Sequence, residues 1–315
     1  MMGAVPHDPH KLAGAIKLKS RHLGFDLAGI APAEVSRYRE YFRQWLDDGR
    51  HGTMAYLSRR FDERVDPRAY LPGARSVICV AMNYYRGDPG PAKGARIARY
   101  AWGEDYHDVV KERLHALADW LRQQMPGIET RACVDTAPVM EKELAARAGV
   151  GWLGKNTCVI NPGIGSWLVL GEIITTLDLP PDEPAVDRCG SCRRCVDACP
   201  TGAIVAPYQL DASRCISYLT IERREPIPRE FHDKLQGWLV GCDICQEVCP
   251  WNSKAPASTQ PAFAPRLADG KIMLSDVLSW TQDDHHRHLR GSAIKRVKLT
   301  VLQANARILA ETREG

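Results

Sequence analysis

Short apolar runs alternate with segments of helical periodicity from about residue 8 to 185. The run at 77–82 predicts a buried strand, and the run at 131–134 predicts another. The segment between them repeats apolar residues at the spacing of one helix face: Val110, Leu114, Leu117 and Leu121. A second helix is expected at 138–148 and a long apolar strand at 167–174. This alternation predicts an α/β domain with helices covering a sheet, and it leaves open whether the sheet is parallel or mixed.

Two proline-rich stretches divide the chain into three regions. Residues 179–184 have the composition of a linker, and a Pro- and Ala-rich connection at 255–265 precedes a helical tail that begins near Ser275. We therefore predict an α/β domain at 1–184, a cysteine-rich domain at 185–255 and a helical region at 256–315.

Composition places the chain among folded proteins of ordinary charge. Of its 315 residues, 44% are hydrophobic and 25% are charged, which excludes a disordered or collagen-like chain. The formal net charge of +4 excludes a histone-like polycation, although it allows a local basic surface. No window approaches the roughly 20 apolar residues of a membrane span, and the N-terminus lacks the pattern of an export signal. We expect a soluble, cytoplasmic protein.

The cysteines are concentrated in one segment, since eight of the eleven lie within residues 189–249. Clustered thiols in a reducing compartment bind metals more often than they form disulfides. The first run has the spacing of a bacterial ferredoxin, in which three thiolates ligate one iron–sulfur cluster and the fourth reaches another. It consists of Cys189, Cys192, Cys195 and Cys199, followed by Pro200. Structural zinc is the alternative, but zinc does not require this spacing followed by proline.

The second cysteine run lacks its first ligand. Cys242, Cys245 and Cys249 keep the last three positions, but Leu239 stands where the first cysteine belongs. Cys215 is the remaining cysteine of the segment and can supply the missing thiolate. Exchange of the fourth ligand between the runs then gives two sets of four. The first set is Cys189, Cys192, Cys195 and Cys249, and the second is Cys199, Cys215, Cys242 and Cys245. The isolated Cys79, Cys133 and Cys158 receive no redox role, and Cys158 is expected to be a small core residue.

Three weaker motifs have ordinary explanations. The glycines at 149–154 match the GxGxxG dinucleotide fingerprint, but they follow a helix rather than a strand, so a helix C-cap and turn are expected. Residues 285–288 look like a metal-binding tract, but the neighbouring charges favour a solvated helix face. Asp135 follows a strand and precedes a helix that contains Pro138. Its local sequence favours a helix N-cap and leaves a proton donor as the alternative.

Ordered matches over nearly the whole chain carry a family resemblance. They include Asp66 to Arg68, Asp105-Tyr106-His107, Val134 to Pro138, Gly151 to Asn156, the cysteine segment with Arg214 to Thr220, and Gly291 to Arg296. Together they resemble the epoxyqueuosine reductases, which complete queuosine in tRNA. The resemblance implies an α/β domain that holds base-off cobalamin, a ferredoxin-like domain with two 4Fe–4S clusters, and a short HEAT-like helical tail. It also implies the final step of queuosine biosynthesis, in which electrons reach cobalt through the clusters and the epoxide oxygen leaves as water.

The resemblance further implies functional residues and partners. Asp135 would be the proton donor, and chemistry near neutral pH would favour a pKa raised by burial under the corrin ring. Cobalamin contacts are implied at Ser58, Ala98, Asp135, Asn156, Val159, Leu170, Ile216 and Gly241, although a plain core role fits Val159, Leu170 and Ile216 equally well. Contacts with tRNA carrying a GUN anticodon are expected at Arg223, Arg224, Lys295, Arg296 and Lys298. A ferredoxin- or flavodoxin-type electron donor, no membrane partner and a monomeric state are also expected.

Two alternative functions are weighed against this one. A reductive dehalogenase also joins cobalamin to two such clusters, but dehalogenases resemble exported proteins with a twin-arginine leader, which this N-terminus does not show. A two-cluster ferredoxin-type electron carrier needs no substrate site, so the large α/β region ahead of the cysteines disfavours it.

Overall fold

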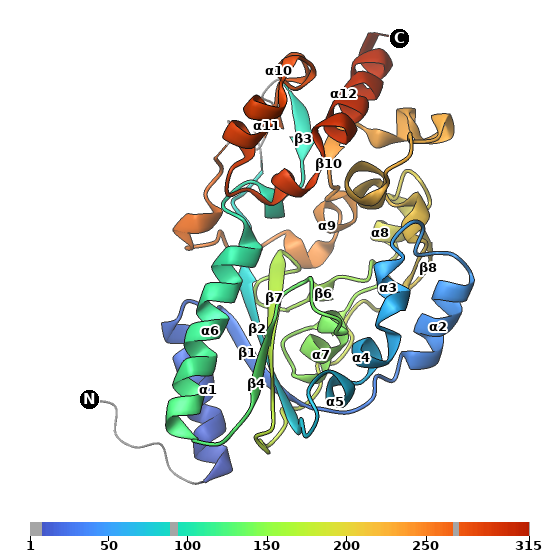
Figure 1. Cartoon of the computed structure of the whole chain (residues 1–315). Helices are drawn as coiled ribbons and strands as arrows, with labels where there is room; N and C mark the ends of the chain where they lie inside the picture. Colours follow the sequence, from blue (N-terminus) through green and yellow to red (C-terminus); the bar gives the residue numbers. More distant parts are fainter. Residues whose placement is uncertain (1–7, 89–93, 267–270, 315) are drawn as a thin grey trace.

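A four-stranded sheet forms the base of the computed structural model, which describes residues 8–88, 94–266 and 271–314 (Figure 1). Its strands, in sheet order, are β1 (Leu27–Pro32), β2 (Ser76–Asn83), β7 (Leu168–Thr175) and β4 (Thr130–Cys133). Every residue of β2 is buried, as the apolar run at 77–82 predicts. The strands predicted at 131–134 and 167–174 are also confirmed, each displaced by one residue.

All neighbouring strands of this sheet run antiparallel, so neither of the arrangements left open, parallel or mixed, is correct. Helical spacing identifies the elements between strands, but it does not say in which direction the chain re-enters the sheet. Here β7 inserts between β2 and β4 after a small hairpin made of β5 (Trp152–Leu153) and β6 (Val159–Ile160). The order in which the strands join the sheet, and not the local pattern of apolar residues, makes the sheet antiparallel.

Helices cover both faces of the sheet (Figure 1). On β2, Ile78 and Val80 pack with α1 (Pro9–His22) and α6 (Tyr106–Gln124). The alternate residues Val77 and Cys79 pack with α7 (Glu141–Arg147), because successive side chains of a strand point to opposite faces. A Cβ on Gly29 of β1 would lie 1.9 Å from the carbonyl oxygen of Ala148, so only glycine lets α7 approach this closely.

A second, three-stranded sheet joins the three regions of the chain. Its strands are β10 (Trp238–Val240), β3 (Ala95–Ile97) and β11 (Lys271–Ile272), one from each predicted region. The core around it likewise draws on all three regions, and the tail helices pack there: α10 (Leu274–Ser279), α11 (Gln282–Leu289) and α12 (Leu299–Glu314). The boundaries at 184 and 255 therefore mark composition along the chain rather than separate cores.

Short elements complete the fold. The helices are α2 (Arg39–Asp47), α3 (Tyr56–Arg59), α4 (Phe61–Val65), α5 (Pro67–Tyr70), α8 (Arg194–Asp197) and α9 (Ile244–Glu247). The remaining strands are β8 (Ile204–Ala206) and β9 (Gln209–Leu210). A π-helix, η3, spans Tyr218–Glu222. The 3₁₀ helices are η1 (Arg99–Ala101), η2 (Ala212–Arg214), η4 (Arg229–Phe231), η5 (Asp233–Leu235), η6 (Pro250–Asn252), η7 (Pro261–Phe263) and η9 (Ala293–Arg296). Within the described residues, no helix is long and apolar enough to cross a membrane.

The structure tests the interpretations of two of the weaker motifs, the glycines at 149–154 and residues 285–288, with different outcomes. Gly149 adopts a φ of +72° directly after the C-cap residue of α7, so the expected C-cap and turn are confirmed. The predicted solvated face at 285–288 is only partly correct. His286 and His288 are exposed, but His285 is buried, with its Nε2 2.9 Å from the carbonyl oxygen of Val297.

Candidate functional site

Asp135 follows strand β4 in a left-handed backbone conformation, with a φ of +45°. Aspartate tolerates this region better than most residues, but it still costs about 1–3 kcal/mol. The backbone N–H of Asp135 donates to Oε1 of Glu141 at the start of α7, which holds the turn. The N-cap interpretation of Asp135 is wrong, because α7 begins only at Glu141 and its N-cap is Met140.

A buried carboxyl lies beneath this turn. Glu172, on the central strand β7, is 0% exposed, and its carboxyl group interacts with that of Glu141. Burial and the neighbouring Glu141 carboxyl raise the pKa of Glu172 well above its ordinary value. Burial and the nearby charge of Asp135 raise the pKa of Glu141 to about 8. Asp135 therefore lies near two carboxyl groups, those of Glu141 and Glu172, whose raised pKa values disfavour their ionised forms.

The Asp135 carboxylate lies between two cationic side chains. Nε2 of His107 is 3.0 Å from Oδ2 of Asp135, and the Arg296 guanidinium is 3.8 Å from the same oxygen. Nδ1 of His107 lies 2.7 Å from Oδ1 of Asp105, the N-cap residue of α6. One imidazole therefore bridges two carboxylates, and Arg296 pairs with both Asp135 and Glu222.

These contacts give Asp135 the opposite pKa shift from the one expected. Burial alone would raise the pKa of Asp135, but the hydrogen bond and charge of His107, with the charge of Arg296, lower it below its ordinary value. The expectation of a raised pKa is therefore wrong for this structure. Burial would lower the pKa of His107, but its hydrogen bonds to Asp105 and Asp135 raise it to about 9. At neutral pH the pair is a carboxylate and an imidazolium, with the proton on His107.

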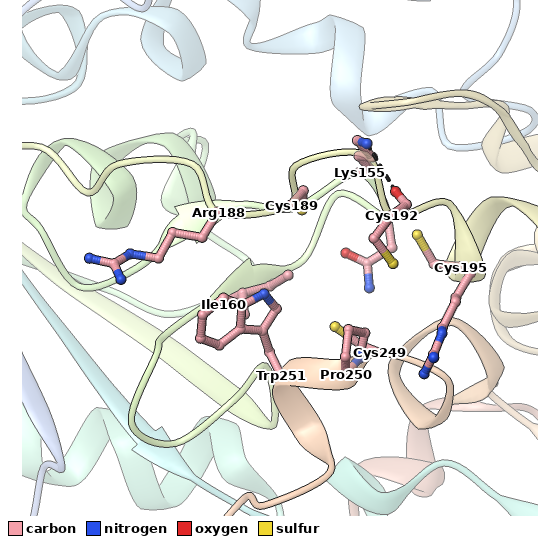
Figure 2. A pocket seen from close by; sticks show the side chains of 11 residues that line it. Lys155, Ile160, Arg188, Cys189, Cys192, Cys195, Cys249, Pro250 and Trp251 are labelled. Carbon is pink, nitrogen blue, oxygen red and sulfur yellow. Dashed lines mark hydrogen bonds between the residues drawn. The ribbon is translucent and has the colours of Figure 1, made fainter.

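The first cysteine set lines one cavity of about 370 Å³ (Figure 2). Its four thiols come from both runs: Cys189, Cys192, Cys195 and Cys249. Burial raises the pKa of Cys249, and negative charge on the other three thiols raises it further. Nζ of Lys155 donates to the carbonyl oxygen of Cys192 at 2.9 Å and ties down the loop (Figure 2). No three His, Cys, Asp or Glu side chains in the described part of the chain converge as ligands of a single metal ion would.

The thiols of the second cysteine set form another group. Burial, followed by negative charge on Cys215 and Cys199, raises the pKa of Cys242. The pKa of Cys245 is raised by a hydrogen bond with Cys158, by burial and by charge on Cys242 and Cys215. The same hydrogen bond lowers the pKa of the Cys158 thiol to about 7. Cys158 thus borders the second set, a placement that its isolated position in the sequence did not indicate.

Four of the positions expected to contact cobalamin lie beside the second cysteine set. Ala98 donates its N–H to the carbonyl oxygen of Val240 at 2.9 Å, and a Cβ on Gly241 would lie 2.5 Å from the Cβ of Ala98. Ile216 belongs to the same core, and the Asn156 side chain donates to the carbonyl oxygen of Cys245 at 3.3 Å. Of the other four, Asp135 is described above, Val159 and Leu170 lie in the core between the sheet and α7, and Ser58 is exposed on α3.

Tyr100 links Asp135 to the second cysteine set. Burial raises the pKa of its hydroxyl, the charge of Arg296 lowers it, and the charges of Asp135 and Asp243 raise it further. Its ring would lie 3.5 Å from a Cβ on Gly241, next to Cys242. The Tyr106 ring meets Tyr100 edge-on at 5.9 Å and stacks on His107 at 4.0 Å. The acid–base pair and the second cysteine set therefore flank the same pair of aromatic rings.

The five expected tRNA contacts have different environments. Arg296 is engaged with Asp135 and Glu222, and Arg223 donates to Glu225 at 2.8 Å. Arg224 is exposed and donates to the backbone oxygen of Ile221 at 3.4 Å. Lys295 and Lys298 are exposed, and neither side chain has a hydrogen bond or ion pair within the described residues. Lys295 and Lys298 are therefore the most available cations of the five.

Two sets of four thiols, the second of them near Asp135 and His107, are typical of a redox enzyme of the double-cluster iron–sulfur class. Comparison with known families agrees, since residues 188–252 match the "4Fe-4S double cluster binding domain" and residues 64–136 match "Epoxyqueuosine reductase QueG, DUF1730". The epoxyqueuosine reductase of Synechococcus sp. (strain RCC307) is 43% identical over 94% of this chain and 93% of its own length. That of Gloeobacter violaceus is 44% identical over 94% of each chain. The chain belongs to the epoxyqueuosine reductase family.

Solved structures share the whole fold. An epoxyqueuosine reductase bound to an epoxyqueuosine-modified tRNA stem loop is 31% identical, with a TM-score of 0.88 over 95% of this chain and 80% of that one. The Bacillus subtilis epoxyqueuosine reductase, solved with its catalytic aspartate loop swung out of the active site, is 30% identical, with a TM-score of 0.90 over 97% and 82%. A reductive dehalogenase at 17% identity and a TM-score of 0.50 shares the fold alone.

Proposed function

We propose that this protein reduces epoxyqueuosine to queuosine at the wobble position of tRNAs with a GUN anticodon. The observation that carries the proposal is the Asp135–His107 pair, which flanks the same aromatic rings as the second cysteine set. Membership of the family and a relative solved with epoxyqueuosine-modified tRNA support it. The proposal includes a cytoplasmic, monomeric enzyme that receives electrons from a one-electron carrier protein.

The proposed cofactors are two 4Fe–4S clusters and base-off cobalamin. Eight soft thiolates in two sets of four are the donor set that two such clusters require. Cobalamin fits the region between Asp135 and the second set, because Ala98, Asn156, Ile216 and Gly241 gather there beside cluster ligands. When bound, cobalamin would supply the strongly reducing cobalt needed to break the epoxide C–O bond.

Residues of this chain transfer the protons that the reaction consumes. Two electrons and two protons convert the epoxide to an alkene and water, so the departing oxygen must be protonated. Asp135, held in place by Glu141, presents its carboxyl to this oxygen, and His107 supplies the proton through its 3.0 Å contact with Asp135. Asp105 keeps His107 protonated and fixes its ring. The lowered pKa of Asp135 keeps it a carboxylate between transfers, and His107 regains its proton from solvent.

Turnover is expected to fall as the pH rises through about 9, because His107, whose pKa is about 9, then loses the proton that it donates. The His107→Asn variant is expected to lose this alkaline limb together with most of its activity. The control His115→Asn changes an exposed histidine on the same helix and should keep the wild-type profile. An alkaline limb unchanged in His107→Asn would remove His107 from the proton path.

The raised pKa of His107 also predicts how the folding stability of the protein depends on pH. The pKa of His107 is raised above its unfolded value of roughly 6.5, so its stabilising contribution is complete below that pH. The contribution is lost as the pH rises from there through about 9. Chemical denaturation at several pH values should show a smaller loss of stability over this interval in His107→Asn than in the wild type.

Lys295 and Lys298 are proposed to contact tRNA phosphates. The double variant Lys295→Glu/Lys298→Glu should weaken tRNA binding and flatten its dependence on salt, by roughly 0.9 in the log–log slope for each phosphate that the protein no longer neutralises. Arg296 is left intact because it pairs with Asp135. The control Lys11→Glu/Lys111→Glu makes the same charge change at exposed positions of α1 and α6. Equal affinities and slopes for the two double variants would exclude the tail as a binding surface.

A further inference from the structure

The cavity of the first cysteine set is surrounded by exposed cations. Arg188 and Arg194 line the cavity, and both are exposed. Within the described residues neither guanidinium makes a hydrogen bond or an ion pair. Arg193, next in the loop, is also exposed and has only a 3.7 Å contact with the exposed Asp197, an interaction of little strength in water. Three guanidinium groups are thus available to a partner.

Apolar surface lies beside these cations. Val186 is 73% exposed, and Tyr208, on the turn between β8 and β9, is 40% exposed. The Tyr208 ring is fixed from both ends, since its hydroxyl donates to Asp187 and its backbone N–H donates to the carbonyl oxygen of Lys155 at 3.0 Å. We call Val186, Arg188, Arg193, Arg194 and Tyr208 the outer-cluster face. A few apolar side chains among cations are typical of transient protein interfaces.

The arginines do not hold the loop that carries the thiols. Lys155 does so, since it is only 9% exposed and its Nζ donates to the carbonyl oxygens of Gly190 and Cys192 in that loop. The Arg188 side chain, in contrast, extends away from the thiol groups (Figure 2). Its orientation suits a molecule that approaches from outside.

We propose that the outer-cluster face docks a small acidic electron-carrier protein of the ferredoxin type. This inference rests on the proposed function, in which the first thiol set holds a redox cluster. In each docking the carrier is oxidised by one electron and this cluster is reduced by one, so two dockings supply one turnover. The second set lies toward Asp135, whereas the exposed arginines surround the first set, so electrons enter at the first set and move inward.

The test uses the reconstituted enzyme and a reduced, acidic plant-type 2Fe–2S ferredoxin as the probe. In Arg188→Glu/Arg193→Glu/Arg194→Glu, both the affinity for this ferredoxin and the rate of cluster reduction, followed by stopped-flow absorbance at low salt, should fall by at least about tenfold. High salt should bring wild type and variant together. The control Arg21→Glu/Arg229→Glu/Arg307→Glu reverses three exposed arginines elsewhere and should behave as the wild type.

Reduction by dithionite separates docking from cluster integrity. Dithionite needs no protein docking, so its rate and the iron content should be the same in the variant and the wild type. Equal ferredoxin affinities and rates in the two would overturn the proposal, as would an equal slowing with dithionite, which would assign the arginines to the cluster itself. Failure of the proposed function has a different signature, namely fully reduced enzyme that leaves epoxyqueuosine unchanged.

Discussion

The Asp135→Asn variant is expected to lose roughly 10²–10⁴-fold in the rate of epoxyqueuosine reduction, the range usually supplied by a positioned acid. Asparagine tolerates the left-handed conformation as aspartate does, and its side-chain oxygen can still accept from His107, so the turn should be preserved. What it cannot do is carry a proton to the departing oxygen. The loss should therefore appear in the chemical step and not in folding.

Single-turnover kinetics with pre-reduced enzyme would isolate that step. Iron content, cobalamin content and tRNA affinity should match the wild type, which would show that only proton delivery has failed. Asp108→Asn, at an exposed aspartate in the first turn of α6, is the matched control and should react normally. Near-normal reduction by Asp135→Asn would contradict the assignment of the acid.

The Cys215→Ala variant is expected to lose an entire cluster. With Leu239 in the place of the missing ligand, Cys215 is needed to complete the second set, so iron should fall from about eight to about four atoms per chain. Reduction of epoxyqueuosine should then stop, because electrons no longer reach the site beside Asp135. Iron analysis and electron paramagnetic resonance of anaerobically reconstituted protein measure this directly.

Cys158 provides a demanding control for Cys215, because its thiol is hydrogen-bonded with Cys245. If the proposed sets are correct, Cys158→Ala keeps about eight iron atoms, the content of two four-iron clusters. Loss of iron in Cys158→Ala with retention in Cys215→Ala would exchange the two residues in the ligand set.

The secondary structure was readable from the sequence where packing follows a simple period. Helix α6 buries a face that repeats regularly along the chain, and strand β2 contains a continuous apolar run that is buried throughout. Strand direction was not readable, because a helix between two strands allows either direction. Nor was the second sheet, since β3 and β11 have only three and two residues and are ordered by pairing with distant segments.

The site was predictable only in part, and mainly through the resemblance. The local sequence around Asp135 favoured a helix cap, and only the family match indicated a proton donor. His107 stands in a matching stretch, but nothing in the sequence tied it to a carboxylate 28 positions away. Arg296 was expected to contact tRNA, and its pairing with Asp135 became visible only in the fold, which brings η9 to that carboxylate. Such pairs also set the pKa values, which is why the direction expected for Asp135 was wrong.

The most direct test of the proposed function is nucleoside mass spectrometry of epoxyqueuosine-containing tRNA after incubation with the reduced, fully loaded enzyme. We expect that epoxyqueuosine disappears and that queuosine, lighter by one oxygen atom, replaces it in equal amount. Epoxyqueuosine that persists unchanged with enzyme shown to hold both clusters and cobalamin would contradict the proposed function.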